Sequence, residues 1–490
     1  MTRRPATGPG ELALVLHTHM PYVEGFGTWP FGEEWLLEAM AGCYLPLLDV
    51  LERATGSVTL SLTPVLADQL EAPGIAERFR AFVGEVREDS HARDIAGLRE
   101  GGHDDLAAEL ERSREDYRAA VAQLDGLGGD LLGALGRHAS WTSSATHAVL
   151  PLLATDAGAR LQIGLGVDSH RERAGDGSGP TRRLAAWRGG FWLPECAHAT
   201  WLDPLLVEAG VRATCVDLTD VLGPGSDAHL RPLHADGGPV LFPIARDVVE
   251  LVWSDGGYPA HGAYRDYHHH TVHHHRPWNN AGHGYDRGAA AATAREHATD
   301  FVGRVRERVA GGGLCVCALD TELLGHWWHE GPIWLDAVLD EAARQDLSLT
   351  NLDDALDRHD PVAVEDALAG GAPAMGRPAE LPVTTWGTPR DLSTWSGPGV
   401  ADLAWRARAA ELRVARAGGA AGTRALRELL ALQASDWTFM VTRELAGPYP
   451  RARADGHAAA LDEALRLGSE ADPVLRNLAP ALTGSALPEP

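Results

Sequence analysis

Hydrophobic residues in the first two-thirds of the chain form short apolar runs separated by longer amphipathic stretches. Such runs are typical of strands in a parallel sheet that is covered on both faces. The stretches between them, such as 34–53 and 203–209, have helical spacing. This alternation predicts an α/β fold, either a barrel or a doubly wound sheet. The predicted strands are Leu12–Leu16, Val58–Leu62, Leu161–Gly164, Gly189–Leu193, Ala213–Val216, Leu314–Leu319 and Leu347–Leu352.

Three other segments depart from this alternation. Residues 84–136 predict a long, charged, helical insertion, and residues 254–290 predict a long loop rich in His, Tyr, Asn and Gly. Residues 371–385 contain the prolines and glycines of a linker, after which the pattern is helical and rich in Ala, Arg and Leu. We therefore expect a main domain at 1–370 and an all-α C-terminal domain at 386–490.

Composition and charge exclude several classes of function. The chain has 43 basic and 68 acidic residues, a net charge of −25, and no lysine among the basic ones. A chain this acidic is a poor candidate for binding nucleic acid or an anionic membrane. Without lysine, Schiff-base catalysis and a GxxxxGK phosphate loop are both excluded. Fifteen tryptophans, against eight phenylalanines and eight tyrosines, favour a ligand with flat, weakly polar faces such as a sugar.

The expected compartment is the cytoplasm. No apolar run approaches the length of about 18 residues that a membrane span requires. The apolar stretch that follows Arg3 and Arg4 is too short for a signal peptide and opens on an acid, Glu11. The five cysteines are sparse and odd in number, and their spacing matches no metal knuckle. Nothing in the sequence indicates an oligomeric state.

Polar side chains follow three of the predicted strands. His17 and His19 come after the first strand, Glu195 after the fourth and Asp320 after the sixth. Ligands of parallel α/β folds bind at the carboxyl ends of the strands. Two carboxylates among aromatics suit glycoside chemistry, one as nucleophile and one as proton donor. Each residue alone has a plainer interpretation, such as a hydrogen-bonded histidine pair, a structural glutamate or a helix N-cap.

The motifs at these positions are specific in combination. They are Leu16-His17-Thr18-His19-Met20-Pro21-Tyr22-Val23, Thr142-Ser143-Ser144-Ala145-Thr146-His147, Phe191-Trp192-Leu193-Pro194-Glu195-Cys196-Ala197 and Asp320-Thr321-Glu322-Leu323-Leu324-Gly325-His326-Trp327-Trp328, followed by Trp386-Gly387-Thr388, Trp395 and Ser435-Asp436-Trp437. Together they resemble glycoside hydrolase family 57, in its group of 1,4-α-glucan branching enzymes. The resemblance extends from about residue 11 to about residue 465.

The resemblance implies an incomplete (β/α)7 barrel and a retaining transfer of α-1,4-glucan chains, with no metal or organic cofactor. Glu195 would be the nucleophile and Asp320 the general acid and base, with their carboxyl groups roughly 5 to 5.5 Å apart. Tyr258 would lie on a mobile loop that keeps water from the intermediate. The residues expected to bind substrate are His17, His19, His147, Trp192, Tyr258, Arg276, Trp327, Trp386, Trp395 and Asp436.

Two departures from the family pattern keep alternatives open. Ala139 stands where the family usually carries a glutamate, and His268–His275 contains six histidines in a loop that differs from the family's. Those histidines could bind Zn²⁺ or Ni²⁺ adventitiously, although a solvated loop is the default expectation. The alternative functions are a 4-α-glucanotransferase or α-glucan hydrolase of the same fold, and a non-catalytic glucan-binding relative.

Overall fold

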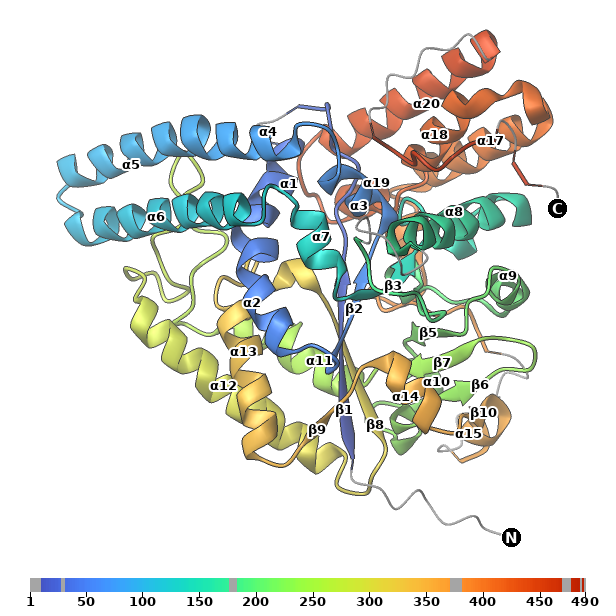
Figure 1. Cartoon of the computed structure of the whole chain (residues 1–490), viewed down its shortest axis with the longest axis horizontal. Helices are drawn as coiled ribbons and strands as arrows, with labels where there is room; N and C mark the ends of the chain where they lie inside the picture. The colour runs from blue at the N-terminus through green and yellow to red at the C-terminus, as the bar shows by residue number, and fades with distance from the viewer. Residues whose placement is uncertain are drawn as a thin grey trace.

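The computed structural model describes residues 10–27, 31–175, 183–370, 381–468, 477–484 and 487–488. Its main sheet is parallel, with strand order β4-β3-β2-β1-β8. Its strands are β1 (Glu11–Thr18), β2 (Val58–Leu62), β3 (Ala139–Ser143), β4 (Phe191–Trp192) and β8 (Leu314–Asp320), with the short β9 (Ser348–Leu349) beside the start of β1. Figure 1 shows β1 and β8 side by side through the middle of the molecule.

A second group of strands curls this sheet into a barrel. It contains β5 (Ala213–Val216), β6 (Leu233–His234), β7 (Val240–Pro243) and β10 (Val362–Ala363). A bridge from Gly190 to Ala213 joins the start of β4 to β5, and β5 pairs in parallel with β7. After β7, the amide of Ala245 donates to the carbonyl of Val316 on β8 at 2.8 Å. Apart from the short β6, β9 and β10, the described residues thus form a barrel of seven parallel strands closed loosely between β7 and β8, which confirms the expected incomplete barrel.

Helices surround the barrel and also form the end of the chain. Those of the first part are α1 (Glu33–Ala39), α2 (Leu45–Arg53), α3 (Pro64–Leu70), α4 (Ile75–Ala81), α5 (Glu88–Glu100), α6 (Asp104–Gly126), α7 (Leu131–Gly136), α8 (Asp156–Ala174), α9 (Asp203–Glu208), α10 (Thr219–Leu222), α11 (Arg246–Val252), α12 (Arg287–Arg308), α13 (Gly331–Arg344), α14 (Leu352–Arg358) and α15 (Val364–Gly370). The last helices are α16 (Ser393–Ser396), α17 (Ala401–Ala417), α18 (Gly422–Leu432), α19 (Ser435–Thr442) and α20 (Tyr449–Leu467).

One predicted strand is wrong. Residues Leu161–Gly164 lie inside α8, whose first turn is capped by the Thr155 side chain accepting from the amide of Gly158. A short apolar run fits a buried helix as well as a buried strand, and the cap six residues upstream decides between them. Two other predicted strands, Gly189–Leu193 and Leu347–Leu352, are reduced to two residues each.

The other departures from the alternation have the following secondary structure. Segment 84–136 is helical, and its α5 and α6 pack together as an arm that projects at the left of Figure 1. The 254–290 region contains only one short 3₁₀ turn, Tyr258–Ala260, before α12 begins. Most of the predicted linker, residues 371–380, lies outside the described residues.

The C-terminal helices share a hydrophobic core with the barrel. In this core Tyr22, Val65 and Ala145, which follow β1, β2 and β3, pack with side chains of α17, α18, α19 and α20. The helices therefore lie over the carboxyl ends of these strands, in the upper right of Figure 1. The amide of Ser435, the first residue of α19, donates to the carbonyl of His147 at 3.1 Å. Side chains at the start of α19 can thus reach the strand ends.

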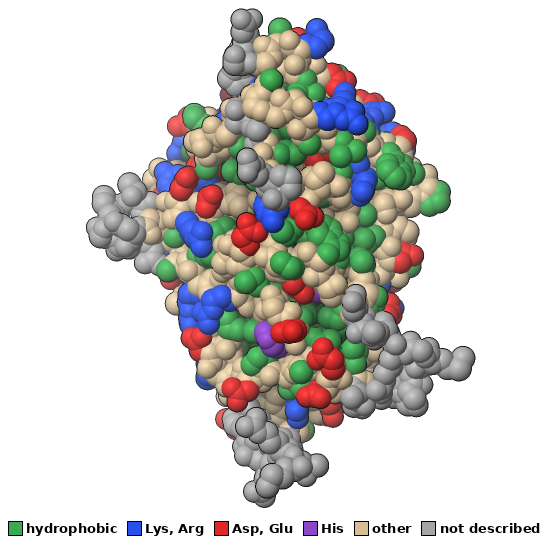
Figure 2. Space-filling model, turned by 90° about the vertical axis from the view of Figure 1, so that its right-hand side faces the viewer, with side chains coloured by type: hydrophobic (Ala, Val, Ile, Leu, Met, Phe, Trp, Pro, Cys, Tyr) green, Lys and Arg blue, Asp and Glu red, His purple; other side chains and the backbone are tan. Residues whose placement is uncertain are grey.

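Four further observations concern surface and composition. Among the described residues, no helix is long and apolar enough to cross a membrane. All five cysteines are buried and unpaired. On the face that Figure 2 presents, acidic and basic side chains are intermixed with hydrophobic ones. In the described ranges, no group of three or more His, Cys, Asp or Glu side chains could hold a metal ion.

Candidate active site

The expected site residues meet at the carboxyl ends of four strands. The register of the sheet pairs His17 on β1 with Ser61 on β2 and with Asp320, the last residue of β8. His147 follows β3 and Glu195 follows β4. Because all four strands are parallel, these side chains lie at one edge of the barrel, as the strand pattern predicted.

The turn that carries Glu195 has an unusual backbone conformation. Glu195 has φ 61° and ψ 23°, and Cys196 and His147 also have positive φ angles, of 48° and 59°. Such angles cost on the order of 1 kcal/mol or more for each non-glycine residue and persist only where the surroundings enforce them. Here the carbonyl of Glu195 accepts from the Thr385 hydroxyl at 2.7 Å and from the Trp386 amide at 3.1 Å. Thr385 and Trp386, which lie before α16 in the chain, therefore help to fix the turn after β4.

Two donors hold the carboxylate of Glu195. The Ser435 hydroxyl donates to its Oε1 at 2.9 Å, and the Trp386 indole N–H donates to its Oε2 at 3.2 Å. Burial raises the pKa of Glu195 to about 7, although both of these hydrogen bonds act in the opposite direction. Hydrogen bonds to the ionised form favour ionisation, so these two donors make Glu195 available as an anion.

A chain of hydrogen bonds extends from this carboxylate to β2. His147 Nδ1 lies 2.9 Å from the Ser435 hydroxyl, His147 Nε2 lies 2.9 Å from His17 Nε2, and His17 Nδ1 lies 3.2 Å from the Ser61 hydroxyl. Burial lowers the pKa of both imidazoles, so each is neutral and has one donor and one acceptor nitrogen. One direction satisfies the whole chain: Ser61 donates to His17, His17 to His147, His147 to Ser435, and Ser435 to Glu195.

The second carboxyl group, Asp320, has a different environment. Among the described residues, none donates a hydrogen bond to its side chain. Burial and the nearby carboxylates of Glu322, Glu195 and Asp436 raise the pKa of Asp320 well above its ordinary range. The ionised form of Glu195 is stabilised by two donors and that of Asp320 by none of the described residues, so the surroundings favour a proton on Asp320 and an anion at Glu195. This division is the one that a nucleophile and a general acid require.

His19 forms an ion pair with Asp436 on the same side of the site. Its Nε2 lies 3.1 Å from both carboxylate oxygens of Asp436, and its amide donates to Glu322 Oε1 at 3.1 Å. Burial lowers the pKa of His19, but the carboxylates of Asp436, Glu322 and Glu195 outweigh this effect and raise it. The Tyr44 hydroxyl also donates to Glu322, at 2.6 Å. His19 and Asp436, both only slightly exposed, thus offer a cation and an anion to polar groups of a ligand.

A row of tryptophans leads from Glu195 to the surface. Trp192 lies edge to face with Trp386 at 5.0 Å between ring centroids, Trp386 lies 6.2 Å from Trp253, and Trp253 lies 5.8 Å from Trp327. Trp253 and Trp327 are 38% and 39% exposed. The sequence reasoning chose Trp192, Trp386 and Trp327 but missed Trp253. Trp253 lies directly after α11, in the segment that resembles the family's tyrosine loop, but there the resemblance points to Tyr258 and not to Trp253.

Three other expected residues lie outside this contact network. Trp395 is 2% exposed and packs with Val149 and Ala197 behind the turn of Glu195. The Tyr258 hydroxyl donates to Asp300 on α12 at 2.7 Å, and its ring stacks on His297. Its place on a loop over the cleft stays a prediction.

Arg276 reaches the edge of the tryptophan row only indirectly. Its guanidinium lies 4.2 Å from the centroid of the Tyr267 ring, which contacts His326, and His326 in turn contacts Trp327. Gly325, the residue before His326, has φ 110°, and a Cβ at this position would lie 2.0 Å from the carbonyl oxygen of Gly42. The turn that leads into His326 therefore requires glycine.

The two departures from the family pattern have separate locations. Ala139 is the first residue of β3, at the end of the strand opposite to the site, and is completely buried in the core. The missing glutamate therefore removes no group from the carboxyl ends of the strands. In the histidine tract, His273 pairs with Asp94 of α5 at 2.6 Å and His275 is buried beside His91. The tract thus packs on the helical arm.

Comparison with known proteins gives a consistent result. The profile described as Glycosyl hydrolase family 57 matches residues 136–367, and the profile described as 1,4-alpha-glucan branching enzyme, C-terminal, matches residues 406–478. The chain is 33% identical to a protein of Mycobacterium tuberculosis described as a probable 1,4-alpha-glucan branching enzyme, an alignment that covers 93% of this chain and 91% of that protein.

Two archaeal proteins give the same picture. The chain is 31% identical to a 1,4-alpha-glucan branching enzyme of Thermococcus kodakarensis, over 91% of this chain and 71% of that protein. The crystal structure of a branching enzyme of this type from Pyrococcus horikoshii matches with a TM-score of 0.81 and 28% identity, over 96% of this chain and 93% of the other. From the fold, the site and these relatives together, the chain belongs to glycosyl hydrolase family 57.

Proposed function

We propose that the protein is a 1,4-α-glucan branching enzyme, which cleaves an α-1,4 link and rejoins the released chain end through an α-1,6 link. The observation that carries this proposal is the contrast between two carboxyl groups of the site. Glu195 lies in a strained turn and accepts hydrogen bonds from two donors, whereas Asp320 accepts none from the described residues. The relatives described as branching enzymes, which align along almost the whole chain, support the type of transfer.

In the first step, Glu195 attacks the anomeric carbon of the donor sugar. The bond from that carbon to the leaving O4 breaks, and Asp320 gives its proton to this oxygen. The product is a covalent glycosyl-enzyme and a shortened glucan chain. Ser435 and Trp386 hold the attacking carboxylate in place, and His19 with Asp436 binds sugar hydroxyls beside it.

In the second step, the 6-hydroxyl of another glucan segment attacks the same carbon. Asp320 takes the hydroxyl proton, and the bond to Glu195 breaks. Water must be kept from this intermediate, since its attack would give hydrolysis instead of a branch. The row from Trp386 through Trp253 to Trp327 offers apolar faces on which the acceptor segment can stack.

The substrate and compartment follow from the same proposal. The substrate is an α-1,4-glucan, and the acidic surface favours an uncharged polymer over nucleic acid or membrane. The five buried, unpaired cysteines suit a reducing compartment, and we propose that the protein acts in the cytoplasm.

The proposal is tested by incubation with linear amylose. Three quantities are followed: the absorbance of the iodine complex, the reducing ends, and the reducing ends after a debranching enzyme is added. A branching enzyme lowers the absorbance with few new reducing ends before debranching and many after it. New reducing ends before debranching would instead indicate a hydrolase, and chain-length redistribution without branches a 4-α-glucanotransferase.

Replacing Ser435 with alanine is expected to shift the acid limb of the kcat/KM profile to higher pH. Glu195 must be ionised to attack, and the Ser435 hydrogen bond lowers its pKa. Loss of that bond raises the pKa, so ionisation requires a higher pH, by about one pH unit. The profile of the Thr438→Ala variant, which loses a hydroxyl on the same helix, provides the control. An unmoved acid limb in Ser435→Ala would contradict the assignment of that limb to Glu195.

Replacing Trp253 with alanine is expected to raise KM for amylose about fivefold while kcat changes little. The indole is 38% exposed and its loss removes a stacking face without touching either carboxyl group. Trp253→Phe should keep most of the affinity. Trp201→Ala is the control, because Trp201 is 42% exposed and lies outside this row of rings. Equal KM values for all four proteins would remove Trp253 from the acceptor side.

A further inference from the structure

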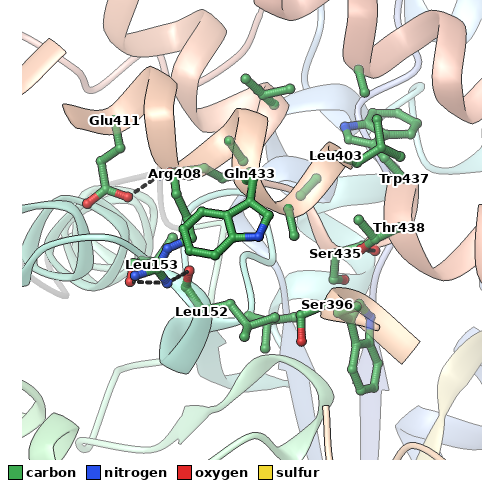
Figure 3. Close-up of a pocket in the computed structure, with 18 residues that line it drawn as sticks. Leu152, Leu153, Ser396, Leu403, Arg408, Glu411, Gln433, Ser435, Trp437 and Thr438 are labelled. Atoms are coloured by element: carbon green, nitrogen blue, oxygen red, sulfur yellow. Dashed lines mark hydrogen bonds between the residues drawn. The ribbon is translucent and has the colours of Figure 1, made fainter. Parts of the chain in front are cut away.

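A pocket separate from the tryptophan row lies between the C-terminal helices and the barrel. It encloses about 300 Å³ and is lined by side chains of α17, of the junction between α18 and α19, and of the segment after β3. Figure 3 shows Arg408 and Glu411 on one side of it and Ser435, Trp437 and Thr438 on the other. Of the predicted substrate-binding set only Trp395 lines it, and Ser435, whose hydroxyl donates to Glu195, lines its inner end.

The packing of this pocket does not explain why the side chain of Trp405 is exposed. The side chain lines the pocket yet is 68% exposed, more than any other tryptophan among the described residues. Trp405, Arg408 and Glu411 follow one another at three-residue spacing on α17, so they lie along one side of the helix. The Arg408 guanidinium lies over one face of the Trp405 ring, 5.6 Å from its centroid, so a ligand would stack on the other face of this exposed indole, close to a charged donor.

The polar groups around Trp405 are fixed in place without using all their hydrogen-bonding capacity. Arg408 Nη1 donates to the carbonyls of Leu152 and Leu153, at 2.7 and 3.1 Å, while its Nη2 has no partner among the described residues. Glu411 is fully buried, accepting from the Thr155 hydroxyl at 2.6 Å and from Gln433 at 2.9 Å. The pocket is therefore preformed, with a free charged donor at its mouth.

A flat apolar face next to free polar groups matches one class of ligand. The pyranose ring has an apolar face for stacking and hydroxyl groups that accept and donate hydrogen bonds. We propose that this pocket, with Trp405 as its platform, is a second α-glucan-binding site outside the cleft. This inference rests on the proposed function. A polymer held at two points binds more tightly than at either alone, because the second contact is intramolecular.

The site is tested by native electrophoresis in gels with and without dissolved amylopectin, whose retardation of the protein gives an apparent Kd. Every protein carries Glu195→Gln, so that the polymer is not altered during the run. Adding Trp405→Ala is expected to weaken the apparent affinity by about five- to tenfold. Trp201→Ala, which removes an exposed indole outside the pocket lining, is expected to leave it unchanged.

Kinetics separate this site from the cleft. In the active enzyme, Trp405→Ala should raise KM for amylopectin and leave kcat, and all constants with maltoheptaose, unchanged. Equal retardation of the Glu195→Gln protein with and without Trp405→Ala would overturn the inference, even if the wild-type enzyme branches amylose. A change in mass by light scattering on Trp405→Ala would overturn it in favour of a contact between copies. If no glucan retarded the Glu195→Gln protein and the wild-type enzyme left amylose unchanged, the proposed function would be contradicted as well.

Discussion

The Glu195→Gln variant is expected to lose glucan transfer by about 10⁴-fold or more while keeping its fold, because an amide cannot act as the nucleophile. The substitution is nearly isosteric, and the surrounding hydrogen bonds can adapt to it. The new amide oxygen can accept from Trp386, and its NH₂ can donate to the Ser435 hydroxyl. Ser435 then donates to His147, and the chain to Ser61 reverses direction without losing a bond.

The measurement is branch formation on amylose, with the thermal unfolding midpoint as the control for folding. A Glu195→Gly variant adds a second test, since glycine adopts φ 61° without strain and leaves room for a small anion. Added azide should then attack the anomeric carbon and give a glycosyl azide of inverted configuration. Substantial transfer by Glu195→Gln, or a rescue product of retained configuration, would remove Glu195 as nucleophile.

The Asp320→Asn variant is expected to lose transfer by about 10²- to 10⁴-fold, the range for a general acid and base. The wild-type kcat/KM should rise with pH as Glu195, with a pKa of about 7, loses its proton. It should fall at higher pH as Asp320 loses its own, because burial and nearby carboxylates raise the pKa of Asp320 well above the ordinary range. In Asp320→Asn the alkaline limb disappears, since no acid remains to be deprotonated there.

An activated donor distinguishes this role from a structural one. An aryl maltooligoside, whose leaving group needs no proton, should form the glycosyl-enzyme in Asp320→Asn at close to the wild-type rate. The intermediate should then accumulate, because the acceptor hydroxyl has lost its base, and mass spectrometry of the intact protein detects the added sugar mass. Equal losses with activated and natural donors would contradict the assignment of Asp320 as the acid.

Much of the arrangement could be predicted because it depends on local sequence. Strand ends in a parallel barrel share one edge, so His17, Glu195 and Asp320 could be expected together from the apolar runs before them. The run Leu161–Gly164 is predicted in the wrong element, because four residues, of which only Leu161 and Ile163 are large and apolar, are too few to show a periodicity. The cap at Thr155 carried the missing information.

The rest depends on contacts between distant segments. Ser435 is 240 residues from Glu195, and nothing in its neighbourhood indicates which carboxylate its hydroxyl faces. Trp253 becomes part of the row only through packing with Trp327 and Trp386. Likewise, the motif around Ala139 does not indicate how far this residue lies from the site. Its position as the first residue of β3, at the end opposite to the site, does.

The placement of α19 has a consequence for how this protein can be divided. One donor to Glu195 comes from Ser435 and the other from Trp386, both beyond the end of the barrel sequence. His19 finds its anionic partner, Asp436, on the same helix. The barrel and the helical end are therefore not a self-sufficient enzyme with an accessory module. Both parts contribute side chains to one reaction centre. Replacing either part alone with that of another protein would therefore remove groups that hold Glu195 and His19.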